Sequence, residues 1–237
     1  MSAGAGGLRV VSLVPSVTES LLSWGVVPVA VTRFCEQPTL LAVGGTKTPD
    51  LDAIADLAPD LVVVNDEENR REDADALVAR GLEVHVCSPR SVAEVGPAMA
   101  ALAVAVGIEA APVDADELAP LGLRAFVPIW RRPWMTLAGD TYGSSLLSSL
   151  GVANVFADGD DRYPTVGLAD VHERAPDVVL APSEPYAFKP LHLDALREVA
   201  PVVEVDGQDL FWWGVRTPAA RRRLHQAIGG AAISPRR

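Results

Sequence analysis

The feature of the sequence that most restricts its fold is an internal repeat of a helical segment, an Ala-Pro-Asp tripeptide and a β-branched run. LDAIADLAPDLVVVNDEE, which begins at Leu51, matches LADVHERAPDVVLAPSEP, which begins at Leu168, at a constant offset of 117 residues. A second match pairs the Ser-Leu-Leu-Ser sequence at Ser20 with the one at Ser145. The repeat predicts two related lobes; the alternative is that two helix–Pro-Asp–strand units are similar by chance.

Short β-branched runs alternate with longer segments rich in alanine and leucine, and this alternation is typical of parallel α/β sheets. The predicted strands are Arg9–Val14, Val27–Val31, Asp60–Val64, Glu83–Val86, Arg124–Ile129, Asp177–Ala181 and Val202–Val205. The predicted helices are Thr18–Trp24, Asp50–Leu57, Arg71–Ala79, Gly143–Leu150, Leu168–Arg174 and Leu191–Val199, the first and third of them closing at Gly25 and Gly81. We therefore expect an α/β fold of two Rossmann-like lobes with parallel-type sheets.

One further helix is predicted between the lobes. Ser91–Glu109 begins with a capping box, in which Glu94 follows Ser91 by three residues, and continues with good helix formers. The expected organisation is an N-terminal lobe over residues 8–90, a connecting helix over residues 91–111 and a C-terminal lobe over residues 112–237.

The composition is that of an acidic globular chain. Of 237 residues, 49% are hydrophobic, and 20 Lys and Arg against 31 Asp and Glu give a net charge of -11. This charge disfavours nucleic acid and anionic lipid as partners, and no uninterrupted apolar run predicts a membrane-embedded segment. The first residues lack a basic region followed by an apolar stretch of signal-peptide length, so we expect a cytoplasmic protein. We also expect it to be a monomer.

Aromatic residues are scarce, and most of them follow predicted strands. Eight of the 13 Phe, Trp and Tyr residues fall in loops at the carboxyl ends of strands, where open α/β sheets bind their ligands. Between two lobes such loops would line a cleft, and rings there suit a large, partly planar ligand. The alternative is that each ring packs onto its own lobe. The eight residues are Phe34, Trp130, Trp134, Tyr186, Phe188, Phe211, Trp212 and Trp213.

Eight segments occur in a fixed order along the chain: RVVSLVPSVTE, VTRFCEQP, VGGTK, PDLVVVNDEEN, WRRPWMTLAGDTYGSSLLSSLGVANVF, RYPTVGL, LAPSEPYAF and DGQDLFWWG. In this order, from Arg9 to Arg216, they resemble the helical-backbone periplasmic-binding-protein family, which binds cobalamin and iron siderophores, and within it the cobalamin-binding-like "helical backbone metal receptor" branch. The resemblance implies two α/β lobes joined by one long helix. It also implies a noncatalytic substrate-binding component of an ABC importer, without an intrinsic cofactor, that holds a corrinoid, haem or ferric siderophore.

The resemblance further implies docking onto an ABC permease through an acidic residue early in the helix that precedes each Pro-Asp strand. Asp52 occupies this place in the first lobe. The matching place in the second lobe is occupied by Ala169, and Asp170 follows it. The expected docking residues are therefore Asp52 and Asp170, although a carboxylate is missing at the second place itself.

Polar residues at the same strand ends complete the predicted site. Glu67 and Glu184 follow equivalent strands, where they would bind a polar ligand edge or pair with Arg33, Arg131 or Arg132; the alternative is that they are solvated loop carboxylates. The predicted ligand-binding residues are Phe34, Cys35, Asn65, Glu67, Trp130, Trp134, Glu184, Tyr186, Phe211, Trp212 and Trp213. No catalytic or metal-ligating residue is predicted.

Cys35 has two interpretations. A thiolate in a cleft could bind a soft or borderline metal ion, but no histidine stands beside it in Cys35-Glu36-Gln37-Pro38. The four histidines fall in a predicted strand or on predicted helices. A small, partly buried residue is the preferred interpretation, and the positions of Cys35 and Cys87 do not establish a disulfide.

Three other motifs are assigned structural roles. Gly44-Gly45-Thr46-Lys47 lacks the glycine spacing of a P-loop and is predicted to be a turn. Asp140 is predicted to cap the following helix, and Arg221-Arg222-Arg223 to lie on a solvated helix face.

Two other functions stay open beside the binding protein. One is a cytosolic sensor or carrier with the same fold. The other is a chelatase-like, cofactor-modifying enzyme, which would need a general acid or base. The candidate groups are Glu67, Glu68, Glu184, Asp206 and Asp209. Because no nucleophile motif or paired-carboxylate pocket stands out, we predict a noncatalytic protein.

Overall fold

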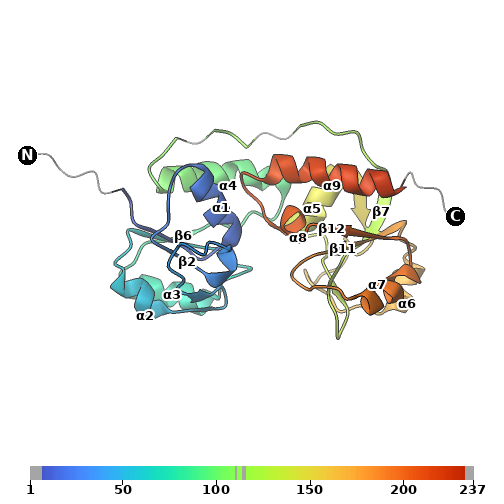
Figure 1. The fold of residues 1–237 in the computed structure, drawn as a ribbon, viewed down its shortest axis with the longest axis horizontal. Coiled ribbons are helices and arrows are strands. Elements are labelled where there is room, and N and C mark those ends of the chain that lie inside the picture. Colours follow the sequence, from blue (N-terminus) through green and yellow to red (C-terminus); the bar gives the residue numbers. More distant parts are fainter. Residues whose placement is uncertain (1–6, 110, 114–115, 233–237) are drawn as a thin grey trace, which may run out of the picture. The chain divides into compact units, whose positions relative to one another are not determined.

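The computed structural model describes residues 7–109, 111–113 and 116–232 (Figure 1). The chain divides into two compact units. Unit 1 comprises Met1–Pro89 and Val95–Val113, and unit 2 comprises Arg90–Glu94 and Asp114–Arg237. The organisation predicted from the sequence, with a separate connecting segment over residues 91–111, stays a prediction.

Unit 1 is built on a four-stranded parallel sheet with strand order β2-β1-β5-β6. The central strand β5 is buried along its whole length. A strand covered on both faces needs apolar residues at every position, which is why LVVV shows no alternation. The elements of unit 1 are β1 (Val10–Ser12), α1 (Pro15–Ser23), β2 (Ala30–Val31), the 3-10 helix η1 (Arg33–Cys35), β3 (Gly44–Gly45), β4 (Thr48–Pro49), α2 (Leu51–Asp56), β5 (Leu61–Val64), α3 (Arg71–Ala79) and β6 (Val84–Val86).

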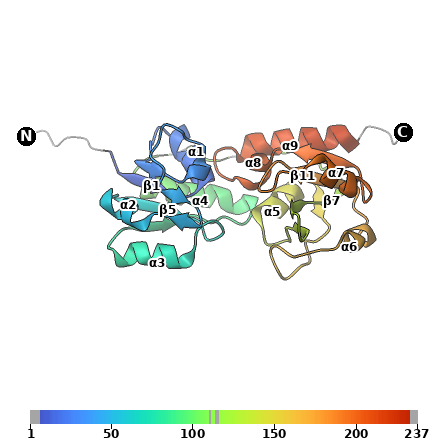
Figure 2. The same ribbon diagram turned by 60° about the horizontal axis from the view of Figure 1, so that its bottom comes forward.

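Helices cover both faces of this sheet. Ile54 of α2 and Leu77 of α3 join strand residues such as Val62 in one buried cluster, and α1 lies on the opposite face (Figures 1 and 2). The predicted closure of α1 at Gly25 is confirmed. Gly25 has φ 76°, and the Val26 N–H donates to the Leu21 carbonyl over 2.9 Å, as expected for a helix that ends in a left-handed glycine.

Unit 2 repeats this plan. Its parallel sheet has the order β10-β7-β11-β12, which matches the order in unit 1 strand for strand along the chain. Val171 of α6 and Leu196 of α7 pack on one face, and α5 and α9 lie on the other (Figure 1). The elements of unit 2 are β7 (Leu123–Phe126), β8 (Pro128–Trp130), β9 (Met135–Thr136), α5 (Tyr142–Ser149), β10 (Val152–Asn154), α6 (Leu168–Glu173), β11 (Val178–Pro182), α7 (Pro190–Arg197), β12 (Val202–Val205), α8 (Gly207–Phe211) and α9 (Thr217–Ala232).

The sequence repeat corresponds to a repeated structural unit. α2 and α6 start 117 residues apart, as do β5 and β11. The alanine of each Ala-Pro-Asp tripeptide lies in the left-handed region, with φ 43° at Ala58 and 46° at Ala175. The aspartates of the two tripeptides accept the backbone N–H of Arg9, just before β1, over 2.7 Å and of Arg124, in β7, over 2.8 Å. The similarity therefore extends to the backbone conformation of the turn.

The helix between the two sheets is shorter than predicted. α4 (Val92–Ala105) starts in unit 2 and continues in unit 1, whereas the sequence predicts helix to Glu109. Gly107 ends it with φ 72°, because the Ile108 N–H turns back to the Ala103 carbonyl.

Several short elements are absent from the sequence-based prediction. They are the hairpins β3–β4 and β8–β9, the strand β10 and the helix α8. Strands of two or three residues contain too few positions to produce a periodic pattern. The predicted strand Arg124–Ile129 is divided in the structure, because β7 pairs in the parallel sheet whereas β8 pairs with β9. Of the turn predicted at Gly44–Lys47, Thr46 and Lys47 form the tip of the β3–β4 hairpin, whereas Gly44–Gly45 are strand β3.

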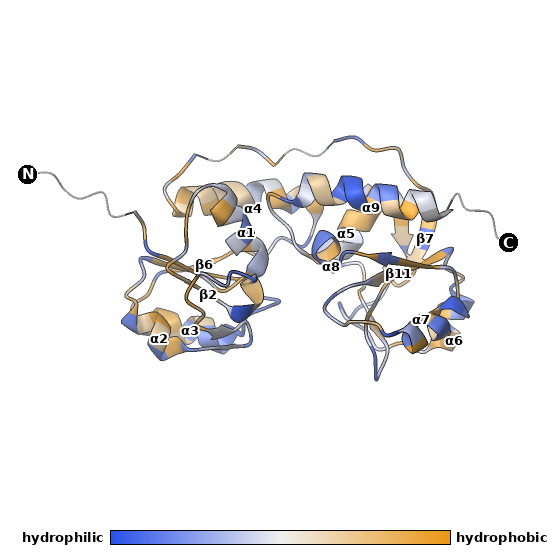
Figure 3. Ribbon diagram, in the orientation of Figure 1, coloured by the Kyte–Doolittle hydropathy of each residue, from blue (hydrophilic) through white to orange (hydrophobic). Residues whose placement is uncertain are grey.

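The sequence predicts that the arginine run of α9 lies on a solvated helix face, but the structure shows one of its arginines buried and the others in ion pairs. Arg221 is 6% exposed and donates to the Ser149 Oγ over 3.0 Å and to the Asp116 carbonyl over 2.8 Å. Arg222 pairs with Asp116, so the hydrophilic part of α9 (Figure 3) includes side chains that fasten the segment before β7.

Hydrophobic residues occur in the strands of both sheets and in helices such as α2 and α5 (Figure 3). No helix within the described ranges is long and apolar enough to cross a bilayer. The predicted fold class, α/β with two parallel sheets, is confirmed.

Candidate functional site

In unit 2, aromatic side chains gather at the carboxyl end of the sheet. Trp130 ends β8 and packs edge-on against Tyr186 with 5.2 Å between ring centroids. Tyr186 lies 5.0 Å from Phe188, and Phe188 stacks on Trp134 at 6.0 Å. These four residues form a connected group, here called the aromatic cluster. Trp130 is 44% exposed, so at least part of the cluster is accessible to a ligand.

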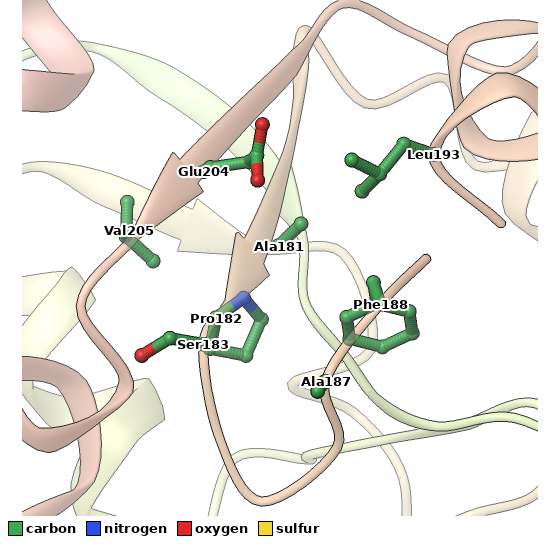
Figure 4. Close-up of a pocket in the computed structure, with 8 residues that line it drawn as sticks. All are labelled: Ala181, Pro182, Ser183, Ala187, Phe188, Leu193, Glu204 and Val205. Carbon is green, nitrogen blue, oxygen red and sulfur yellow. The ribbon is translucent and has the colours of Figure 1, made fainter. Parts of the chain in front are cut away.

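The aromatic cluster borders a pocket of about 240 Å³ at the carboxyl ends of β11 and β12 (Figure 4). Pockets that enclose a whole small-molecule ligand measure roughly 300–1,000 Å³, so this pocket has room for part of a large ligand. Its wall is neutral except for one carboxylate. The lining residues are Ala181, Pro182, Ser183, Ala187, Phe188, Leu193, Glu204 and Val205.

Glu184 is held in place beside the pocket by α8. Its Oε1 accepts a hydrogen bond from the Trp212 Nε1–H over 2.8 Å. The first residue of α8 is Gly207, where a Cβ would lie 2.5 Å from the Glu184 Cγ and 2.7 Å from its backbone nitrogen. Only glycine therefore permits this approach, and Glu184 is ordered by a contact within unit 2.

Asp209 is a buried carboxylate between two guanidinium groups. It is 2% exposed, and its oxygens accept from Arg223 Nε at 2.6 Å and from Arg216 Nη1 at 3.4 Å. Arg216 also lies 4.9 Å from the centre of the Trp212 ring. Asp209 therefore holds α9 against α8 and supports the Trp212–Glu184 contact, which is a structural role and not proton transfer.

The other predicted aromatic residues of unit 2 are less accessible. Trp213 is 5% exposed and Trp134 is 7% exposed. Phe211 is half-buried and lies over the start of α5, where a Cβ on Gly143 would meet its ring at 3.4 Å. For these residues the structure has packing partners within unit 2.

In unit 1, Phe34 projects from η1 next to the β3–β4 hairpin. Its side chain is 49% exposed, and the Arg33 guanidinium lies 4.9 Å from its ring centre. A Cβ on Gly45 would approach the Phe34 ring to 3.1 Å, so the β3–β4 hairpin packs directly against the ring. Phe34 is the accessible aromatic residue predicted for this unit.

Cys35 follows Phe34 in η1, and its buried thiol contacts two threonine hydroxyl groups. Its Sγ is 3.2 Å from the Thr18 Oγ1 and 3.3 Å from the Thr32 Oγ1. Burial raises the pKa of the Cys35 thiol, which opposes the thiolate that metal binding requires. Both cysteines are buried and free, without a disulfide between them. Among the described residues, no three His, Cys, Asp or Glu side chains are grouped as a metal site would require.

Asn65 shapes the loop that carries Glu67. The Asn65 side chain is buried; its Nδ2 donates to the Cys87 carbonyl over 3.0 Å, and its Oδ1 accepts the N–H groups of Glu67 at 2.7 Å and Glu68 at 3.1 Å. This is the geometry of an Asx turn. Glu67 itself is half-buried, and its carbonyl accepts from Lys47.

The two predicted docking residues differ in their surroundings. Asp52 is 87% exposed and forms an ion pair with Arg80 at 2.7 Å. The Asp170 carboxylate accepts the Gly167 N–H over 3.1 Å and thereby caps its own helix.

His192 also lies beside the aromatic cluster. The sequence pattern places it on a predicted helix and not in a loop at a strand end, so it is not predicted to be near the site. His192 lies in the first turn of α7, and its ring centre is 5.7 Å from that of Tyr186. Its Nδ1 accepts the Lys189 N–H over 3.2 Å. The signal in the sequence is Lys189-Pro190, since a proline marks the start of a helix and places residues of the next turn beside the preceding loop.

No family model matches the chain. Two sequence relatives are vitamin B12-binding proteins. The one from Salmonella paratyphi A is 26% identical over 189 residues, which cover 73% of this chain and 71% of the relative. The one from Vibrio cholerae serotype O1 is 26% identical over 190 residues, which cover 72% and 69%.

Solved structures have the same fold. The periplasmic vitamin B12 binding protein of Vibrio cholerae superposes with a TM-score of 0.74 at 19% identity over 96% of this chain and 99% of that chain. A periplasmic heme binding protein from Pseudomonas aeruginosa superposes with a TM-score of 0.78 at 18% identity over 94% and 93%. These relatives are binding proteins and not enzymes, in agreement with the prediction from the sequence.

The predicted location is wrong. The start of the sequence predicts a cytoplasmic protein, whereas the solved relatives are periplasmic proteins.

Proposed function

We propose that the chain, a sequence relative of vitamin B12-binding proteins, is a member of the helical-backbone family of metal-chelate receptors and binds a corrinoid or a related metal chelate without catalysing a reaction. The observation that carries the proposal is the aromatic cluster at the carboxyl end of the second sheet. Rings in this place suit a large, partly planar ligand, and strand ends are where open α/β sheets bind.

The proposed ligand contacts are those with accessible rings. In unit 2 they are Trp130 and Tyr186, with Phe188 at the wall of the pocket, and in unit 1 Phe34. Haem and ferric siderophores are further candidate ligands, because heme-binding proteins have the same fold. Cys35 and Asn65 are proposed to support the site from below and not to touch the ligand, since both are buried.

Glu67 and Glu184 are proposed to bind polar groups at the ligand edge. The support is their half-buried position at the ends of equivalent strands and the orientation of Glu184 by Trp212. Such a contact would distinguish ligands by their peripheral groups.

An importer is the proposed partner, with Asp52 as the docking carboxylate. Its exposure favours this role, whereas Asp170 is engaged in capping its own helix. Docking would therefore depend more strongly on Asp52.

The proposal is tested by mixing the purified protein with cobalamin, cobinamide, hemin or a ferric siderophore. Binding quenches tryptophan fluorescence and shifts the visible spectrum of the ligand. In Trp130→Ala we expect a roughly tenfold or greater loss of affinity, because a central aromatic contact is worth about 2 kcal/mol. Trp24→Ala, at the far end of α1 from the strand ends, is the matched control and should leave affinity unchanged. Absence of binding to all four ligands would refute the proposal.

A further inference from the structure

We propose that Arg131 is a specificity-determining residue that selects ligands with a carboxylate or similar anionic group at their edge. The inference rests on the proposed function and narrows its ligand class: the site would take a metal tetrapyrrole with free carboxylates in preference to a corrinoid whose side chains are amides.

Arg131 is held by an aromatic ring. Its guanidinium lies 4.6 Å from the centre of the Trp134 ring, in the turn between β8 and β9. The side chain is half-buried, and its Nε is buried without a hydrogen-bond partner. A buried donor that lacks a partner is costly, by about 1–3 kcal/mol. This cost is understandable if a ligand supplies the acceptor.

The positive charge of Arg131 is not neutralised by a carboxylate. Within the ranges that the structure describes, Arg131 has no ion pair, although the chain carries a net charge of -11. Several other arginines of unit 2 are in ion pairs, and Arg124 and Arg221 donate to backbone carbonyls. Ion pairs join Arg174 to Asp158, Arg197 to Asp194, Arg216 and Arg223 to Asp209, and Arg222 to Asp116. The charge of Arg131 is therefore available to an external anion.

The backbone next to Arg131 is strained in a way that keeps the turn tight. Arg132 has φ 75°, a left-handed conformation that a residue with a side chain adopts at a cost of about 1 kcal/mol. Trp134 contacts the Arg131 guanidinium and also stacks on Phe188, so Arg131 adjoins the aromatic cluster. A ligand that lies on the accessible rings of the aromatic cluster is therefore near the guanidinium.

Unit 1 contains a similar pair. The Arg33 guanidinium lies over the exposed Phe34 ring, and Arg33 has no ion pair among the described residues. In both units, then, a predicted aromatic contact is accompanied by an arginine that no described carboxylate neutralises. Each pair by itself would suit an anionic group, whereas a neutral group would leave the guanidinium unmatched.

The test compares three ligands that differ at the edge: hemin, which has two carboxylates, its neutral dimethyl ester, and cobinamide, which has amides. Affinities are measured by absorbance titration at pH 7.5. We expect the wild-type protein to bind hemin at least about tenfold more tightly than the ester, since charge-assisted hydrogen bonds are roughly twice as strong as neutral ones. In Arg131→Gln the preference should fall to less than about threefold, with the affinity for the ester unchanged.

Two further variants separate a local contact from general charge. Arg132→Gln removes the same charge from the neighbouring, exposed residue and should keep the preference for hemin. Arg131→Lys keeps the positive charge but loses the planar guanidinium, so it should keep part of the preference for hemin. Thermal unfolding of each variant identifies any that is misfolded. Equal loss in Arg132→Gln would overturn the assignment to Arg131.

The outcomes also distinguish this inference from the proposed function. If the ester or cobinamide binds as tightly as hemin, the preference for anions is refuted and metal-chelate binding stands. If none of the three ligands binds, the preference for anions is refuted, and the proposed function is refuted with it when cobalamin and a ferric siderophore also fail to bind.

Discussion

At the scale of single residues, the two cysteines show how burial changes chemistry. Cys87 is 2% exposed, and burial raises the pKa of its thiol from an ordinary value of 9.0 to about 12. Burial likewise raises the pKa of Cys35, only partly opposed by hydrogen bonds from Thr18 and Thr32. Neither thiol is therefore a thiolate at neutral pH, and both act as small core residues.

The raised pKa of Cys87 predicts a loss of stability in alkali. Below pH 9 the thiol is protonated in both the folded and the unfolded chain, and it contributes no pH dependence. Between pH 9 and pH 12 the unfolded chain ionises while the folded chain does not, so the free energy of unfolding falls as the pH rises. By pH 10.5 we expect this one group to cost about 2 kcal/mol.

This loss is measured by urea denaturation at pH 8 and pH 10.5 for the wild type and for Cys87→Ala. The variant starts from a lower stability, but its decrease between the two pH values should be smaller. An equal decrease in both proteins would contradict the assignment.

At the scale of elements, the repeated Ala-Pro-Asp turn fastens each lobe in the same way. Besides the contact of the aspartate with the backbone, the Arg9 guanidinium donates to the Leu57 carbonyl over 2.7 Å, and that of Arg124 to the Arg174 carbonyl over 2.7 Å. Each turn thereby joins the end of a helix to the start of two adjacent strands. The tripeptide is repeated because both lobes need this connection.

We expect Asp60→Ala and Asp177→Ala to lower the free energy of unfolding by similar amounts, about 1 kcal/mol each, because each removes one hydrogen bond to a backbone N–H. Urea denaturation measures the change. Asp56→Ala, at an exposed position of α2, serves as the control and should change stability by less than about 0.5 kcal/mol. Losses at Asp60 and Asp177 no larger than this would mean that the turn does not depend on the aspartate.

At the scale of the whole molecule, charge decides which macromolecules the chain avoids. With a net charge of -11 the chain repels polyanions over the range of the Debye length, about 8 Å at physiological salt. The arginine run of α9 does not alter this, because Arg221, Arg222 and Arg223 are engaged with Ser149, Asp116 and Asp209.

The chain should therefore pass through a heparin column at about 0.1 M NaCl and bind to an anion exchanger under the same conditions. Retention on heparin that is lost in Arg222→Gln would instead identify the basic run of α9 as a polyanion site.

Much of the candidate site could be predicted because parallel strands bring their carboxyl ends to one edge of a sheet. This rule predicts that Trp130, Tyr186 and Phe188 lie together, and the ring contacts agree with it. The rule says nothing of side-chain packing. Trp134 and Trp213 follow strands in the same way and are nevertheless almost fully buried.

The sequence by itself determined the α/β architecture, since the β-branched runs are local patterns, and its offset of 117 residues predicted the duplication that the structure confirms. Only the tertiary structure decided which charges are neutralised. Asp209 and Arg223 are separated by a turn and part of a helix, Arg221 and Asp116 by 105 residues, and no periodicity links them. Pairing depends on distances of a few ångströms between side chains, and these arise only when helices and loops pack. For the same reason the unmatched charge of Arg131 becomes visible only in the folded chain.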